Sequence, residues 1–163
     1  MNTTIALRSQ HGFTFIELAI TLAILGVLVL IATPTAKMVV QREKEVELRR
    51  ALIQIREGLD AYKRAVEQGR IPTKVGESGF PPSLDDLVAG VVDAKNPSRQ
   101  KIYFLRSLPR DPLYPDSQVT AAETWGKRSY ASPPEDPTEG ADVFDVYSLS
   151  ERVGLNGIPY SKW

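Results

Sequence analysis

The chain has 163 residues, with 20 basic and 20 acidic side chains, no cysteine and one histidine. A net charge of zero argues against a nucleic-acid-binding protein, which normally carries a strongly basic face. The lack of cysteine excludes disulfides, thiolate nucleophiles and cysteine-based metal sites in this chain. The apolar residues are concentrated near the N-terminus, so the average composition conceals one segment of different character.

Residues 13–33 form an apolar run of 21 residues in which Glu17 is the only charged side chain. As an α-helix, a segment of this length spans roughly 30 Å, about the thickness of a bilayer hydrocarbon core. Pro34 ends the run and is expected to kink or open the helix, because it lacks a backbone donor and clashes with the preceding turn. We therefore predict a membrane-spanning helix over residues 13–34.

Two other interpretations of the apolar run stay open. It could be a secretory signal peptide cleaved within residues 32–36, although it is longer than the roughly 7–15 apolar residues usual for such a peptide. It could also be a plain single-span anchor. Neither gives a role to Glu17, although a carboxylate at the start of a membrane span is costly and normally has a partner. No basic residue of the span can reach it, so the counter-charge must come from elsewhere or be created.

The string GFTFIELAITLAILGVLVLIATP, residues 12–34, resembles the N-terminal signature of type IV pilins and type II secretion pseudopilins. The resemblance implies that a prepilin peptidase removes residues 1–12 as a leader, cleaving after Gly12, and then methylates the amine of Phe13. It also implies an assembly role for Glu17, and Pro34 stands where the family often has a helix-breaking proline. The new ammonium group of Phe13 would supply the counter-charge of Glu17. If the partner is the next subunit, the contact is open-ended and produces a filament.

Residues 35–69 are predicted to continue the helix, now as an amphipathic segment. Apolar side chains recur at helical spacing on one face: Leu48, Ala51, Leu52, Ile55, Leu59, Tyr62 and Val66. Gly69 follows and is expected to end the helix. Glu45 and Arg49 are expected to form an i,i+4 ion pair. Residues 35–47 lack a clear apolar stripe and are expected to project from the domain.

Residues 70–163 are rich in proline and glycine and predict a small α+β domain. The segment PPSLDDLVAG predicts a short helix with Ser83 as N-cap and Gly90 as stop. Short runs of β-forming residues predict an antiparallel sheet packed on the long helix: 101–105, 128–131 and 142–149. Asn156–Gly157 predicts a tight turn near the end.

PPSLDDLV, LPRDP and FDVYSLS extend the resemblance to the major pseudopilin of type II secretion. That resemblance implies a pilin-like fold, in which a long helix packs against a three- to four-stranded antiparallel sheet. It also implies a calcium loop after the last strand. Here residues 150–154 offer only the carboxylate of Glu151, beside Arg152, whereas calcium takes six to eight oxygen ligands. We therefore assign no metal or cofactor, and expect packing of Tyr160 and Trp163 to hold the loop.

The sequence does not predict an enzyme, because the single histidine, His11, lies in the expected leader. The resemblance implies a subunit of a helical fibre that drives type II protein secretion. Its implied partners are copies of itself, other pseudopilins, prepilin peptidase, the inner-membrane platform and membrane lipid, and not nucleic acid. Its implied location is the inner membrane, single-pass, with the C-terminal domain in the periplasm. A type IV pilin and a membrane-anchored periplasmic binding module remain alternatives.

Overall fold

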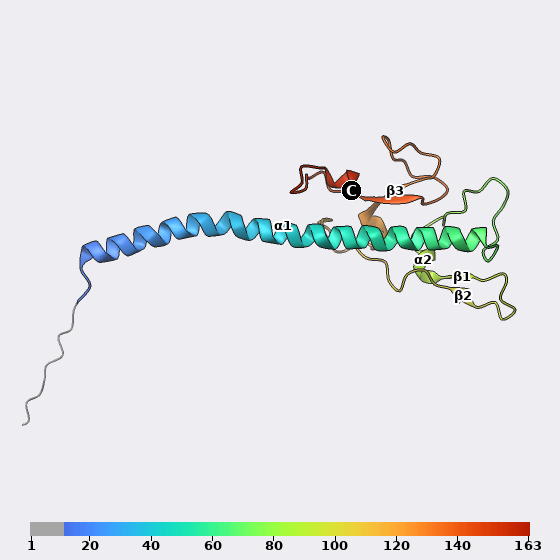
Figure 1. Cartoon of the computed structure of the whole chain (residues 1–163), viewed down its shortest axis with the longest axis horizontal. Coiled ribbons are helices and arrows are strands. Elements are labelled where there is room, and N and C mark those ends of the chain that lie inside the picture. The colour runs from blue at the N-terminus through green and yellow to red at the C-terminus, as the bar shows by residue number, and fades with distance from the viewer. Residues whose placement is uncertain (1–11) are drawn as a thin grey trace, which may run out of the picture. The chain divides into compact units, whose positions relative to one another are not determined.

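The computed structural model describes residues 12–163, with the backbone alone described over residues 30–36. The chain is an α+β protein with one long helix, α1, over Phe15–Glu67, followed by short helices and strands (Figure 1). Its internal contacts divide it into a unit that ends at Val40 and a second unit over Gln41–Trp163.

Both ends of α1 have a clear local cause. At the start, the Oγ1 atom of Thr14 accepts a hydrogen bond of 3.3 Å from the backbone N–H of Glu17. At the end, Gly69 adopts a φ of 68° and donates its N–H to the carbonyl of Val66 at 2.7 Å, so the predicted glycine stop is confirmed. The helix continues through Pro34 without the opening expected there. A proline removes one backbone hydrogen bond from a helix, and the neighbouring turns here stay helical.

The first unit presents its apolar side chains to the surroundings. Phe15 is 87% exposed and Leu28 57% exposed, and the other large apolar side chains described between them are also exposed. Over the residues that the structure describes, no helical stretch is both long enough and apolar enough to cross a bilayer.

The second unit has one core, built on the predicted stripe of α1. Six of the seven stripe residues are buried, and Val66 is partly buried against them. Leu48 and Ile55 are fully buried, which is worth about 1.5–3 kcal/mol for each side chain. The stripe packs against residues from the rest of the domain, among them Leu84, Leu87, Trp125, Val146 and Tyr160.

The strands form two small antiparallel sheets rather than a single one. Strand β1 (Val91–Val92) pairs with β2 (Lys101–Ile102), and β3 (Trp125–Arg128) pairs with β4 (Asp145–Ser148). The first pair is short because the chain leaves the sheet after Ile102. There the N–H groups of Phe104 and Leu105 both donate to the carbonyl of Leu87.

The predicted strand over 128–131 lies too late in the chain. The observed strand β3 ends at Arg128, because the next residue, Ser129, donates its N–H to the carbonyl of Thr138 and turns into a loop. The predicted strand over 142–149 is confirmed in its second half, where β4 lies.

The short helix α2 covers Asp86–Ala89 and ends at Gly90, whose φ is 74°, as predicted. Ser83 is not its N-cap. Instead, the N–H and hydroxyl of Ser83 donate to the carboxylate of Asp86 at 3.2 and 2.9 Å. Two 3₁₀ turns complete the fold, at Ala122–Thr124 and Tyr160–Lys162.

Candidate functional site

Gly12, Phe13 and Glu17 lie at the exposed start of the described chain. Gly12 and Phe13 precede α1, and the Phe13 side chain is 78% exposed. Glu17 lies in the first turn of the helix, where a negative charge interacts favourably with the helix dipole. Residues 12 and 13 are therefore exposed and lie outside any helix or strand.

Glu17 also occupies the third position of a capping sequence, Thr14-Phe-Ile-Glu17. In such a box the first side chain accepts from the N–H of the glutamate, and this bond is present. The return bond, from the glutamate carboxylate to the N–H of Thr14, does not form, and that carboxylate has no hydrogen bond or ion pair with another described residue. Capping thus uses the backbone of Glu17 and leaves its charge for another partner.

Two motifs of the globular domain, LPRDP and FDVYSLS, meet in the structure. The buried carboxylate of Asp111, from LPRDP, accepts hydrogen bonds from the Ser148 hydroxyl at 2.5 Å and the Leu113 N–H at 2.7 Å. The indole N–H of buried Trp125 donates to the carbonyl of Pro109 at 2.9 Å. These contacts fasten the 109–113 turn to β3 and β4, so the motifs have a structural role.

Gly126 explains why a glycine follows Trp125. It pairs with Tyr147 across β3 and β4, and a Cβ atom on it would lie 2.4 Å from the tyrosine ring. The ring therefore lies directly over the glycine, which any side chain would prevent.

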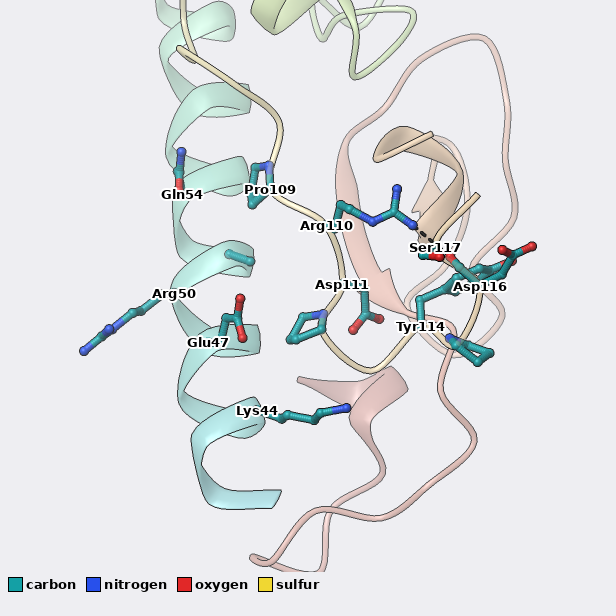
Figure 2. A pocket seen from close by; sticks show the side chains of 13 residues that line it. Lys44, Glu47, Arg50, Gln54, Pro109, Arg110, Asp111, Tyr114, Asp116 and Ser117 are labelled. Carbon is teal, nitrogen blue, oxygen red and sulfur yellow. Dashed lines mark hydrogen bonds between the residues drawn. The ribbon is translucent and has the colours of Figure 1, made fainter. Parts of the chain in front are cut away.

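A charged cleft of about 670 Å³ lies between α1 and the 109–117 loop. In Figure 2, Lys44 extends toward the loop and Arg50 is turned away from it. Arg110 donates to the backbone carbonyls of Val119 and Asp116, and Asp111 is bound to Ser148. Arg110 and Asp111 therefore hold the loop in place.

Glu45 is a buried residue that the sequence analysis misplaced. Its Oε1 atom accepts hydrogen bonds from the Tyr160 hydroxyl at 2.8 Å, the Leu155 N–H at 2.8 Å and the Gln41 side chain at 3.3 Å. The expected ion pair with Arg49 is not formed. Instead, the Arg49 guanidinium lies over the Trp163 ring, 4.4 Å from its centre. Residues 41–47 therefore do not all project from the domain as expected.

The helical period contains the signal that would have found Glu45. It precedes Leu48 by three residues and Leu52 by seven, which places it on the buried face of α1. Burial by itself raises the pKa of the Glu45 carboxyl, but the hydrogen bonds from Leu155, Tyr160 and Gln41 outweigh it, so its pKa is lower than the ordinary 4.5. Burial and the bond to Glu45 raise the pKa of the Tyr160 hydroxyl.

Residues 150–154 do not fit a calcium ion. The Arg152 guanidinium lies within the loop, with Nε 3.5 Å from the Ser150 hydroxyl, and Glu151 is exposed. Among the residues that the structure describes, no three histidine, aspartate or glutamate side chains are grouped closely enough to hold a metal.

Two comparisons with known proteins point to the same kind of protein. The model of the prokaryotic N-terminal methylation motif matches residues 7–33. The type II secretion system core protein G of Klebsiella michiganensis is 25% identical over 142 residues, which cover 83% of this chain and 90% of that protein. Together these matches support a pseudopilin assignment. The chain is therefore similar to the pseudopilins of type II secretion.

No solved structure matches the chain. The pseudopilin assignment gives the charged residues described above their context. Pseudopilins are structural subunits and not enzymes, so the cleft beside α1 needs no catalytic role. The assignment also makes the exposed start of α1, rather than a pocket, the candidate functional site.

Proposed function

We propose that this pseudopilin is processed after Gly12, is held in the inner membrane by residues 13–33, and assembles through α1 into a fibre that drives type II secretion. The observation that carries the proposal is the methylation motif over residues 7–33, joined to similarity with a type II secretion core protein over most of the chain. The periplasm would then contain the domain that follows.

The charges at the start of α1 support this mechanism. Cleavage after Gly12 creates an ammonium group on Phe13, and methylation of an amine preserves its positive charge. Thr14 caps the helix through the backbone N–H of Glu17, so the Glu17 carboxylate can pair with the ammonium group of Phe13. Phe13 and Thr14 lie outside α1, so this short segment can direct the amine toward its own Glu17 or that of a neighbouring subunit.

A neighbouring subunit is the partner that makes a polymer. A contact between the amine of one chain and the carboxylate of the next does not close on itself, and open contacts of this kind generate helical fibres. In a low-dielectric bilayer such a pair is also a strong constraint, because either charge alone is costly there. The prepilin peptidase, the inner-membrane platform, other pseudopilins and membrane lipid are the partners that this function requires.

Substitutions at Glu17 test the proposal by separating charge from capping. Glu17→Gln keeps the backbone N–H that binds Thr14 and removes the charge, and Thr14→Ala removes the cap and keeps the charge. We expect Glu17→Gln and Glu17→Ala to lose at least about tenfold in fibre yield, the effect of roughly 1.4 kcal/mol. Thr14→Ala should lose less, because a cap contributes about 1 kcal/mol to a long helix.

The measurement is the amount of sheared fibre from cells that express each variant at equal level, with secretion of a reporter scored in parallel. Glu17→Gln fibres at wild-type yield would show that the carboxylate has no role in assembly.

A further inference from the structure

The last segment of the chain, residues 151–163, is fastened to α1 around one buried carboxylate. Three donors converge on the Oε1 atom of Glu45: a backbone N–H, a phenol and an amide. Two of these donors belong to the segment itself, from Leu155 and Tyr160. The third, Gln41, also donates to the Tyr160 oxygen at 2.9 Å and to the Val153 carbonyl at 3.5 Å.

A second group of contacts, made by aromatic rings and two arginines of α1, also holds this segment. The rings of Tyr160 and Trp163 meet edge to face at 5.1 Å, with Arg49 over the Trp163 ring. Arg56 donates to the Trp163 carbonyl at 2.8 Å. A Cβ atom on Gly154 would lie 2.6 Å from the Trp163 ring, so the segment folds tightly on itself.

The segment contains a single carboxylate, Glu151, and that group is exposed. The other charged side chains of the segment, Arg152 and Lys162, are both cations. A calcium ion would need six to eight oxygens at this place and would meet a guanidinium instead. The charge that organises the segment therefore comes from α1 and is negative.

We propose that the Glu45 carboxylate locks residues 151–163 onto α1 and makes the fold of this segment independent of any divalent cation. A buried carboxylate that accepts three hydrogen bonds can hold a loop in place as a bound cation does. The carboxylate attracts hydrogen-bond donors, whereas a cation attracts oxygen ligands. Among the described side chains no buried polar atom lacks a partner, so the lock is complete as it stands. This inference does not rest on processing or polymerisation of the pseudopilin.

The test uses the full-length protein in detergent micelles and measures amide hydrogen exchange in peptides from residues 151–163. Glu45→Gln keeps the shape of the side chain and removes its charge, so exchange there should rise about tenfold. Tyr160→Phe removes one donor and should raise exchange about fivefold. The control Glu43→Gln changes an exposed neighbour by the same chemistry and should exchange as the wild type does.

The same protein is then melted in EDTA and in millimolar calcium chloride. The proposal predicts the same Tm and the same exchange of residues 151–163 in both. It is overturned if calcium slows exchange in this segment or raises the Tm. Wild-type exchange in Glu45→Gln overturns it too. Should Glu45→Gln fail to fold, Tyr160→Phe serves as the test, because the loss of one hydroxyl leaves the core intact. Wild-type exchange of residues 151–163 in Tyr160→Phe would also overturn the proposal.

Discussion

Two glutamates of α1 differ in what surrounds them, and the difference sets what each does. Glu17 is exposed, and its carboxylate has no partner among the described residues, so it suits a contact that forms only on assembly. Glu45 is 8% exposed and accepts three hydrogen bonds within its own chain, so it suits a permanent internal contact. We therefore propose different roles for these two glutamates of one helix.

The lowered pKa of Glu45 gives a pH dependence of definite sign. Its ionised form is favoured in the folded chain by donors from Gln41, Leu155 and Tyr160, with Arg49 nearby. The stability from this charge is fully present above the unfolded pKa near 4.5 and is lost as pH falls below that value through the folded pKa. Arg152, which faces Tyr160, stays charged throughout this range.

We predict that the difference in Tm between wild type and Glu45→Gln is constant at neutral pH and narrows below about pH 4.5. Protonation makes the wild-type carboxyl neutral, as the glutamine already is. Thermal melts of both proteins from pH 7 to pH 3.5 measure the difference, with Glu43→Gln as the control for general effects of acid. A Tm difference that stays constant, or grows, as the pH falls would contradict the proposal that the ionised carboxylate of Glu45 holds residues 151–163.

At the scale of elements, α1 contributes the central face of the domain core. The stripe from Leu48 to Tyr62 is buried, and most of the residues between its members are exposed or partly exposed. Ile53 and Ile55 are two residues apart on the helix and show the contrast directly, since the first is 56% exposed and the second fully buried.

Ile55→Ala should lower the free energy of unfolding by about 2–5 kcal/mol, because it leaves a cavity at the centre of the core. Ile53→Ala should change it by less than about 0.5 kcal/mol, since that side chain is largely in solvent or at a surface. Urea unfolding of the full-length protein in detergent, followed by tryptophan fluorescence, measures both. Equal losses in the two variants would mean that the face of α1 is assigned wrongly.

Much of this arrangement could be predicted from the sequence, and the limits have physical causes. Helical periodicity identified the stripe of α1, and glycines identified its end and that of α2, because both signals are local. The strand bounds were wrong because the ladders end where long-range bonds take over, as at Ser129. Glu45 was assigned to a local ion pair because two of its three donors come from residues more than 100 positions away.

At the scale of the whole molecule, the proposed function of the protein depends on cleavage after Gly12. The methylation motif over residues 7–33 covers both the end of the proposed leader and the apolar run. In our proposal, cleavage after Gly12 supplies a positive charge beside Glu17, because no basic residue lies in the run from residue 13 to residue 33. The anchoring, assembly and secretion that we propose all depend on this cleavage.

Mass spectrometry of the protein purified from the membranes of its native host tests this account most directly. We predict a mature chain that begins at Phe13, with a methyl group on its α-amine, in both the intact mass and the N-terminal peptide. A protein that supports secretion while retaining residues 1–12, or that begins near Ala36, would contradict the account.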